Sequence, residues 1–425
     1  MLAIAKKFYL KHKELISNIL WRSVQFFTKQ FLSFYIFLLA AYFFSPYDFG
    51  HYNYTLSIIF FLIIFSDLGL STATSTFTVD YSHREQHKVP ELFISILFLL
   101  STISFAISTL FLIFGRLIFG SNFTDVLYLL PLVFLIPATS LLDGIYRGLG
   151  RFKKLSVIFF SCSAVSMIGI FFLVKYYGIV GAYLSQTFYY AMVLVFLLAN
   201  YRDYSFKVNS KIIKEVSKYS VIIGIANIGF FFYSRVDSLF LGSYGFIKEV
   251  GYFEIVNKIL ILILTPLSVI PAVIAPVNTK IYLEKKYEVL LKSFYSYLIL
   301  SLGLSVVIVT VLFFSYGPIF SLFPKYNSSS MLLIARLMTI VFFTQILNSF
   351  FPEGFAIPTG YANISMYLLL IFGALNVILD YLFINIFGFI GVVYGTILTK
   401  CTTDFLFIYI YHRSLKKRIA KTDEK

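Results

Sequence analysis

Apolar runs of about 20 residues recur along the whole chain, separated by short polar stretches. Each run is long enough to cross roughly 30 Å of hydrocarbon as a helix, so the pattern predicts membrane spans. We predict twelve of them, at about 19–44, 52–76, 91–114, 124–146, 155–174, 179–199, 219–242, 252–274, 293–315, 330–350, 362–384 and 389–411. The spans leave no room for a soluble domain, and the fold class they predict is an all-α integral membrane protein.

The composition agrees with this class, because 59% of the residues are hydrophobic, 13% are charged and the mean hydropathy is +0.86. The N-terminus resembles a secretory signal, since several lysines precede the apolar run from Phe31 to Phe44. The segment is too long for a signal, lacks a small-residue cleavage site and is followed by spans of the same kind. We therefore expect an uncleaved first helix.

The Lys and Arg residues alternate between the two sides that the twelve spans define. Of the 35 basic residues, 25 fall in one set of loops and in the two ends, and four fall in the other loops: Arg116, Lys175, Lys248 and Lys325. Cytoplasmic loops carry the excess of basic residues, so both termini are predicted to be cytoplasmic. Topology and anionic lipid headgroups account for the net charge of +15 without a nucleic-acid partner.

Little in the sequence points to catalysis or to a cofactor. Cys162 and Cys401 both fall within predicted spans, and the five histidines lack the spacing of metal ligands. The sequence contains no phosphate-binding loop and no nucleophile elbow. We expect a transporter without metal or cofactor rather than an enzyme.

The two halves of the chain repeat one plan. Gly178 and Gly181 enter the sixth span as Gly388 and Gly391 enter the twelfth, at an offset of 210 positions that also relates the loop glycines 150 and 360. The stretch 48–52 before the second span similarly matches 249–253 before the eighth. Glycines are common at helix starts, which is the alternative explanation. The pattern predicts two six-helix bundles related as a parallel repeat, at 1–200 and 219–411, with a cytoplasmic linker at 201–218 and a basic cytoplasmic tail at 412–425.

Six basic residues lie inside the predicted spans, where a Lys or Arg near the bilayer centre costs about 2.5 to 3.5 kcal/mol on insertion scales. Such groups usually face a bundle interior or a wet cavity, where they pair with each other or with a substrate. All six are therefore candidates for binding an anionic substrate: Arg22, Lys29, Arg235, Lys258, Arg336 and Lys400.

Alternatives remain open for most of these cations. Lys258 and Lys400 each have an acid four residues away, Glu254 and Asp404, and could form neutral local pairs. Arg336 and Arg22 lie near span ends, from which a long side chain can reach the interface. Lys29 differs, because it shares a helical face with Arg22 and Gln25 in a span that holds no acid. The partner of this face must come from another span.

Three acids inside the spans are candidates for binding a coupling ion: Asp67, Asp237 and Asp380. A carboxylate in hydrocarbon either takes up a proton or finds a cation, and both behaviours suit proton or sodium coupling. The alternative is a salt bridge to one of the six cations. Arg235 and Asp237 stand about 200° apart around a helix, so we expect Arg235 to face a cavity and Asp237 a neighbouring helix or a coupling site.

Several segments resemble those of the Wzx-type polysaccharide flippases of the multidrug/oligosaccharidyl-lipid/polysaccharide (MOP) exporter superfamily. They are 46–52 (PYDFGHY), 67–70 (DLGL), 146–153 (YRGLGRFK), 237–242 (DSLFLG) and 250–252 (VGY). The resemblance implies two MATE-like six-helix bundles, a cationic cavity and alternating access. One departure is that the loop 352–361 lacks the basic residues of its counterpart after the fourth span.

The implied substrate is an undecaprenyl-diphosphate-linked oligosaccharide repeat unit of O-antigen or capsule. It would pass to the periplasmic leaflet of the bacterial inner membrane, with H⁺ or Na⁺ as the coupling ion. A polysaccharide polymerase and a chain-length regulator are the protein partners that this role implies. Lys and Arg are natural partners of a diphosphate. The alternative is a cation-coupled multidrug antiporter of the same superfamily, which should carry unpaired acids for cationic drugs.

Overall fold

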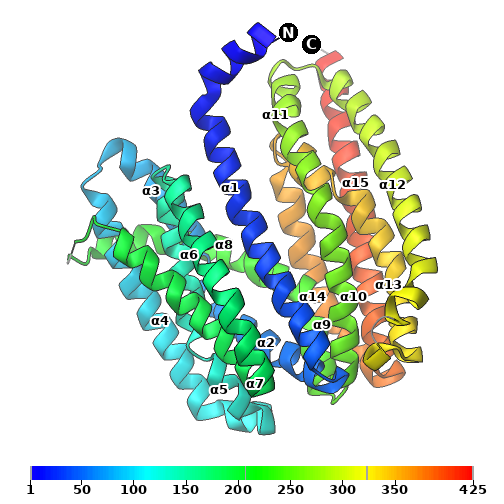
Figure 1. The fold of residues 1–425 in the computed structure, drawn as a ribbon. Coiled ribbons are helices and arrows are strands. Elements are labelled where there is room, and N and C mark those ends of the chain that lie inside the picture. Colours follow the sequence, from blue (N-terminus) through cyan, green and yellow to red (C-terminus); the bar gives the residue numbers. More distant parts are fainter. Residues whose placement is uncertain (1, 206, 322–323, 424–425) are drawn as a thin grey trace. The chain divides into compact units, whose positions relative to one another are not determined.

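The computed structural model describes residues 2–205, 207–321 and 324–423, and these residues form helices joined by short turns (Figure 1). Residues 206, 424 and 425, which belong to the predicted linker and tail, lie outside the described part. The first half comprises α1 (Leu2–Phe43), α2 (Pro46–Asp67), α3 (Leu70–Arg84), α4 (Lys88–Phe119), η1 (Gly120–Asn122), α5 (Phe123–Leu129), α6 (Leu132–Gly148) and α7 (Phe152–Asn200). The second comprises α8 (Ser210–Ser234), α9 (Val236–Ser243), α10 (Ile247–Leu267), α11 (Val269–Leu283), α12 (Tyr287–Ser321), η2 (Pro324–Tyr326), α13 (Ser329–Asn348), η3 (Pro352–Ala356), α14 (Ala362–Phe387) and α15 (Phe389–Asp423).

Ten helical stretches of the described chain are long and apolar enough to cross a membrane, which confirms the fold class. Two features explain why ten stretches are counted where twelve spans were predicted. The first is that α7, which counts as one stretch, turns back at Gly178 and holds the fifth and sixth predicted spans. The second is that α15 is not among the ten, because polar residues such as Lys400 and Asp404 lower the hydropathy of the twelfth predicted span.

The contacts within the chain divide it into two compact units. Unit 1 comprises residues 1–44 and 55–227, and unit 2 comprises 45–54 and 228–425. The division differs from the predicted boundaries in two places, since α8 is shared between the units and the start of α2 packs in unit 2. Gly50 explains the second difference, because it packs against the carbonyl oxygen of Ile247 and the amide of Gly251, so closely that no Cβ would fit.

The predicted repeat has a counterpart in backbone geometry. Gly178 and Gly388 both have positive φ, 57° and 62°, and each lies at the turn between the two arms of a helical hairpin. A Cβ on Gly181 would lie 1.9 Å from the carbonyl oxygen of residue 173, and one on Gly391 would lie 2.1 Å from that of residue 383. Both pairs obey the offset of 210. The two hairpins therefore close on the same backbone contact, which only a glycine permits.

The basic segments of each unit gather at one end of that unit. In unit 1, Arg151 forms an ion pair with Asp203 at 3.1 Å, and Asn209 donates a hydrogen bond to Glu91 at 3.0 Å. These contacts join the loop before α7, the segment after α7 and the start of α4. In unit 2, Arg418 donates to the hydroxyl of Tyr361 at 3.3 Å, which joins the end of α15 to the start of α14.

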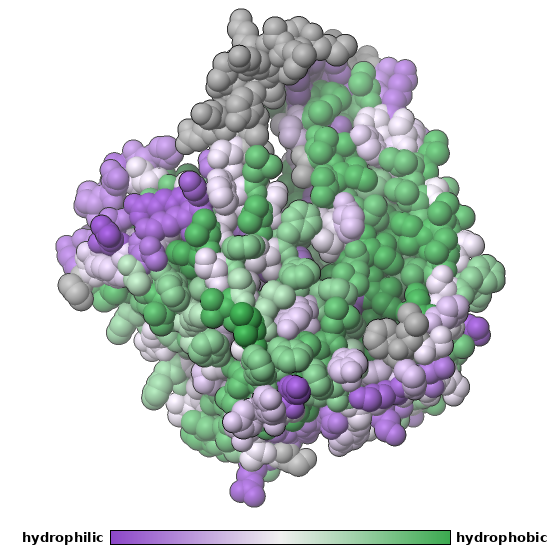
Figure 2. All heavy atoms as spheres, viewed as in Figure 1, coloured by the Kyte–Doolittle hydropathy of each residue, from purple (hydrophilic) through white to green (hydrophobic). Residues whose placement is uncertain are grey.

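Apolar side chains cover the flanks of the helices between the polar ends, and Figure 2 shows them over α12. On this helix Ile299, Val307 and Phe314 are each more than 60% exposed. Exposed aliphatic and aromatic side chains along a whole helix are suited to contact with lipid tails. The small residues instead face neighbouring helices, as at Gly144 and Gly148 of α6, which pack against α3.

Candidate functional site

Unit 1 holds a polar cluster in which one carboxylate is shared by several donors. Asp143, on α6, is buried and accepts a hydrogen bond from Nε2 of Gln25 on α1 at 2.5 Å. Its other oxygen, Oδ2, lies 3.2 Å from Nε of Arg147, one turn later on the same helix. Arg22 on α1 lies 3.6 Å from Oδ1 and also donates to Gln25. Asp143 is therefore the partner of the basic face of the first span.

Lys29 extends this cluster along α1. Its Nζ lies 4.0 Å from the centre of the Phe159 ring on α7, within the range of a cation–π contact. The side chain of Lys29 remains exposed, whereas Gln25 beside it is buried. Three cations, Arg22, Lys29 and Arg147, thus surround one carboxylate, which leaves two positive charges for a ligand. An anion with two charges matches this balance.

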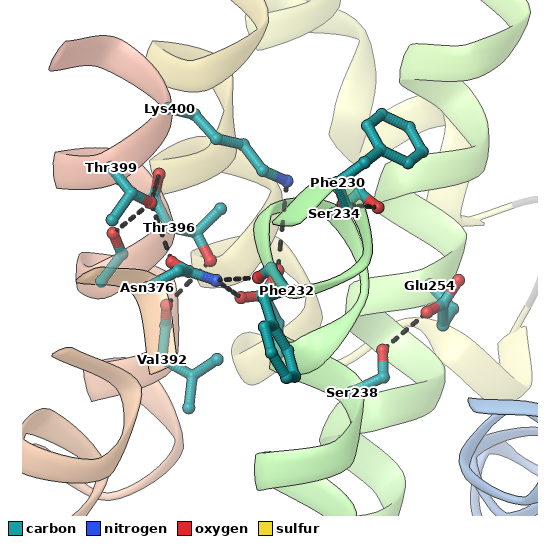
Figure 3. A network of polar contacts seen from close by, with 12 residues as sticks. Phe230, Phe232, Ser234, Ser238, Glu254, Asn376, Val392, Thr396, Thr399 and Lys400 are labelled. Carbon is teal, nitrogen blue, oxygen red and sulfur yellow. Dashed lines mark hydrogen bonds and ion pairs between the residues drawn. The ribbon is translucent and has the colours of Figure 1, made fainter. Parts of the chain in front are cut away.

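A second cluster lies in unit 2, where α9, α14 and α15 pack together, and Figure 3 labels Asn376, Thr399 and Lys400 within it. Asn376 on α14 donates to Oδ1 of Asp237 at 2.7 Å and accepts from Thr399 at 2.8 Å. Lys400 on α15 places its Nζ 4.0 Å from Oδ2 of Asp237. Asp237 is fully buried and Lys400 is only 5% exposed, so this ion pair is screened little by water.

Asp380 completes the second cluster one helical turn after Asn376. It is fully buried and interacts electrostatically with both Asp237 and Lys400. Neither of its carboxylate oxygens has a hydrogen-bond partner among the described residues. Two carboxylates therefore share one ammonium group, which leaves one negative charge in a buried site. Such a charge is costly unless a proton or a metal cation neutralises it.

Lys400 pairs with an acid on another helix. A neutral local pair with Asp404, four residues later, was one alternative from the sequence, but the ion pair of Lys400 among the described residues reaches across to Asp237. Asp404 instead accepts a hydrogen bond from Asn348 of α13 at 2.8 Å. Asn348 and Asp404 line a cavity of about 320 Å³ within unit 2, which extends to Glu353 at the basic end of the unit. A cavity of this size with several polar side chains in its wall has room for water.

Arg235 and Asp237 have different surroundings, because Arg235 is exposed at the break between α8 and α9 whereas Asp237 is buried. Lys258 on α10 interacts electrostatically with Glu254, one turn earlier on the same helix, and with Arg235. Glu254 also accepts a hydrogen bond from Ser238 at 2.6 Å. Arg235 and Lys258 thus form a basic pair beside one acid.

Two candidates lie apart from both clusters in their contacts. Arg336 is exposed on α13, and its guanidinium carbon lies 5.6 Å from the centre of the Phe313 ring. Asp67, in unit 1, accepts hydrogen bonds from the amide, at 3.1 Å, and from the hydroxyl of Ser71. It thereby caps α3 at the break where Leu68 and Gly69 both have positive φ. A structural role explains the position of Asp67.

Sequence reasoning missed Asp143 and Asn376. Asp143 lies within the predicted fourth span, one turn before Arg147, and an isolated acid in a span was a signal that could have identified it. Asn376 gave no comparable signal, because a neutral amide in a span is not unusual. Its role becomes visible only when α9 and α15 are placed beside α14.

A family model described as "Polysaccharide biosynthesis protein" matches residues 15–282, and the MatE family model matches 223–382. A solved inward-facing MATE multidrug transporter of the MOP superfamily is similar over 92% of this chain and 96% of its own, with a TM-score of 0.73 and 16% identity. The lipid II flippase MurJ is similar over 94% of this chain and 87% of its own, with a TM-score of 0.68 and 18% identity.

An uncharacterized membrane protein of Methanocaldococcus jannaschii is 22% identical over 417 residues, which cover 91% of this chain and 95% of that protein. The fold is that of a multi-pass helical membrane protein, similar to that of the MATE transporter and of MurJ. The polysaccharide biosynthesis model matches more than half of the chain, and the chain belongs to that family.

Proposed function

We propose that the protein is a flippase for a diphosphate-linked oligosaccharide carried on a polyprenyl lipid such as undecaprenol. The cluster around Asp143 carries the proposal. It leaves two positive charges, on Arg22, Lys29 and Arg147, for a diphosphate that itself carries about two negative charges. The ammonium of Lys29 would contact the diphosphate, while Asp143 and Gln25 orient Arg22.

The unit 2 cluster would couple transport to an ion gradient. Its carboxylate pair, Asp237 and Asp380, needs one more positive charge for neutrality, and a proton or a sodium ion would supply it. Binding of that ion would weaken the hold of Asp237 on Lys400. Alternating access would then return the empty carrier to the cytoplasmic leaflet.

The topology belongs to the same proposal. Both termini and the basic ends of the two units would lie in the cytoplasm of a bacterium, as the distribution of Lys and Arg predicts. Lipid-linked repeat units of O-antigen or capsule would then leave for the periplasmic leaflet. A polymerase and a chain-length regulator would act on them there.

Reconstitution into proteoliposomes with a fluorescent diphosphate-linked oligosaccharide tests the proposal directly. We expect Arg22→Ala and Lys29→Ala to lower the initial flipping rate at least tenfold, and Arg235→Ala to lower it as well. Lys175→Ala is the matched control, because Lys175 also packs on aromatic rings of unit 1 but lies near the turn at Gly178. Full activity of the Arg22, Lys29 and Arg235 variants would overturn the assignment.

A multidrug antiporter is the second candidate, favoured by the MatE match over 223–382 and by the likeness to MATE transporters. The buried acids of unit 2 would suit a cationic drug, whereas the net positive cluster of unit 1 would repel one. A drug-susceptibility panel on a deletion strain separates the two functions. Hypersensitivity to cationic drugs with normal surface polysaccharide would favour the antiporter.

A further inference from the structure

A cavity of about 780 Å³ lies within unit 1, between α1 and the two arms of α7. Ser17, Asn18 and Trp21 of α1 form one wall. The first arm of α7 contributes residues from Arg151 to Val165, and the second arm contributes Met192, Phe196 and Asn200. Ser156 ties the two helices together by donating to the carbonyl oxygen of Trp21 at 2.5 Å. None of its lining residues belongs to the Asp143 cluster.

The two ends of this cavity differ in chemistry. Three basic residues, Arg151, Lys153 and Lys154, line the end that belongs to the basic end of unit 1. The rest is lined mainly by apolar side chains such as Val157, Ile158 and Phe196. A ligand that fits must therefore join an anionic group to an apolar chain.

The basic residues are held in place to different degrees. Lys154 donates to the carbonyl oxygen of Asn200 at 2.7 Å, and Arg151 is paired with Asp203. Lys153 is exposed, and its Nζ lies 5.8 Å from the centre of the Trp21 ring rather than beside a carboxylate. Lys153 thus keeps its charge available to a ligand beside a tryptophan, a residue type enriched at membrane interfaces.

The repeat shows that the fold itself does not need these charges. Gly150 and Gly360 adopt the same positive φ, 68° and 82°, so both loops turn in the same way. At the offset of 210, the counterparts of Arg151, Lys153 and Lys154 are Tyr361, Asn363 and Ile364. The turn therefore forms with neutral residues in the second half of the chain. The three charges of the first half have a role other than forming the turn.

We propose that this cavity holds an acidic phospholipid, with its phosphate at Lys153 and an acyl chain along α7. The helical rise from Lys153 to Val165 is about 18 Å, which is close to the depth of one leaflet, roughly half of a 30 Å hydrocarbon core. Basic pockets between membrane helices on the cytoplasmic side are known sites for anionic headgroups. The lipid would fasten α1 to α7 beside the substrate cluster.

Lipid titrations of the purified protein in detergent, followed by native mass spectrometry, test this site. We expect retention of phosphatidylglycerol at lower concentration than phosphatidylcholine with the same acyl chains. Lys153→Gln should weaken phosphatidylglycerol binding about fivefold, the effect of one basic residue near the headgroup. Lys214→Gln removes an equally exposed charge from unit 1 outside the cavity and should change binding less than twofold.

A second pair of variants tests the apolar part. Ser161→Trp fills the cavity and should abolish retention, whereas Ala164→Trp adds the same bulk to an exposed position outside the cavity lining and should not. Equal retention of phosphatidylcholine, or equal effects of Lys153→Gln and Lys214→Gln, would overturn the proposal. A shift of the thermal unfolding midpoint by glycerol 3-phosphate alone that equals the shift by phosphatidylglycerol would also overturn it, because the acyl chain would then contribute nothing. Displacement of phosphatidylglycerol by a polyprenyl diphosphate would overturn it too, because the cavity would then belong to the transported lipid.

Discussion

Gln25 and Asp143, 118 positions apart, are joined by a hydrogen bond of 2.5 Å from the amide Nε2 to the carboxylate Oδ1. The bond links α1 to α6 in the apolar interior of unit 1, and it fixes the carboxylate between Arg22 and Arg147. A single buried acid thus sets the positions of cations that would otherwise repel each other. The stability of unit 1 and the proposed substrate site depend on the same residue.

Asp143→Asn should lower the thermal unfolding midpoint in detergent by several degrees, a destabilisation of about 1–3 kcal/mol. The cause is that Arg22 and Arg147 lose their carboxylate while Gln25 keeps only a neutral partner. Asp80→Asn provides the control, because it breaks an exposed ion pair with Arg84 in the same unit and should have little effect. An equal loss in both variants would contradict the role assigned to Asp143.

The charge of Lys29 matters more than its shape if it contacts a diphosphate. Lys29→Arg should retain most of the flipping rate, because arginine keeps the charge and binds phosphate well, whereas Lys29→Gln should lose about tenfold. Rates measured at increasing salt should also fall more steeply for the wild type than for Lys29→Gln. Equal activity of the Arg and Gln variants would show that Lys29 only packs on Phe159.

Asp380→Asn removes the unneutralised charge of the unit 2 cluster. We expect flipping to continue but to lose its acceleration by an imposed proton or sodium gradient, because Asp237 alone is balanced by Lys400. Asp67→Asn is the comparison, since the asparagine oxygen can keep the hydrogen bond that caps α3, so stability and coupling should both persist. Loss of coupling in Asp67→Asn alone would move the ion site to unit 1.

Gly181→Ala and Gly391→Ala should each destabilise the protein by about 1–3 kcal/mol or prevent its expression, because the new Cβ would overlap a carbonyl oxygen. Gly169→Ala serves as the matched control on α7, where nothing lies within 4 Å of an added Cβ. It should be neutral or stabilising by up to about 1 kcal/mol. Thermal unfolding of the three variants in detergent measures the difference.

Cysteine labelling checks the topology. In a variant without Cys162 and Cys401, a cysteine at position 116 should react with a membrane-impermeant maleimide on intact cells. A cysteine at position 285 should react only after permeabilisation, because the distribution of basic residues places it in the cytoplasm. Reversed labelling would overturn the orientation but not the fold.

Hydrophobic patterning was enough to predict the helical membrane fold, because each apolar run of about 20 residues has one way to satisfy its backbone in lipid. The glycine repeat was also visible in the sequence. Gly178 and Gly388 lie in turns with a positive φ that other residue types rarely adopt, so both halves carry a glycine there. The breaks at Gly69 and Arg235 were not predicted, because both interrupt otherwise apolar spans. A local pattern of hydropathy does not reveal where a helix bends.

The candidate sites were predictable only as lists of charged residues. Sequence placed Asp67 among the coupling residues with Asp237 and Asp380, but the contacts separate Asp67, which bonds to Ser71, from the other two. Lys400 lies four residues from Asp404 and yet pairs with Asp237, 163 positions earlier. Pairing across helices depends on their packing and rotation, which the spacing of residues along one helix cannot supply.

The start of α2 packs in unit 2, and α8 begins in unit 1 and ends in unit 2. Each compact unit therefore contains chain from both halves of the sequence. A gene split near residue 209 would therefore leave each polypeptide without a segment of its own unit, 210–227 in one case and 45–54 in the other.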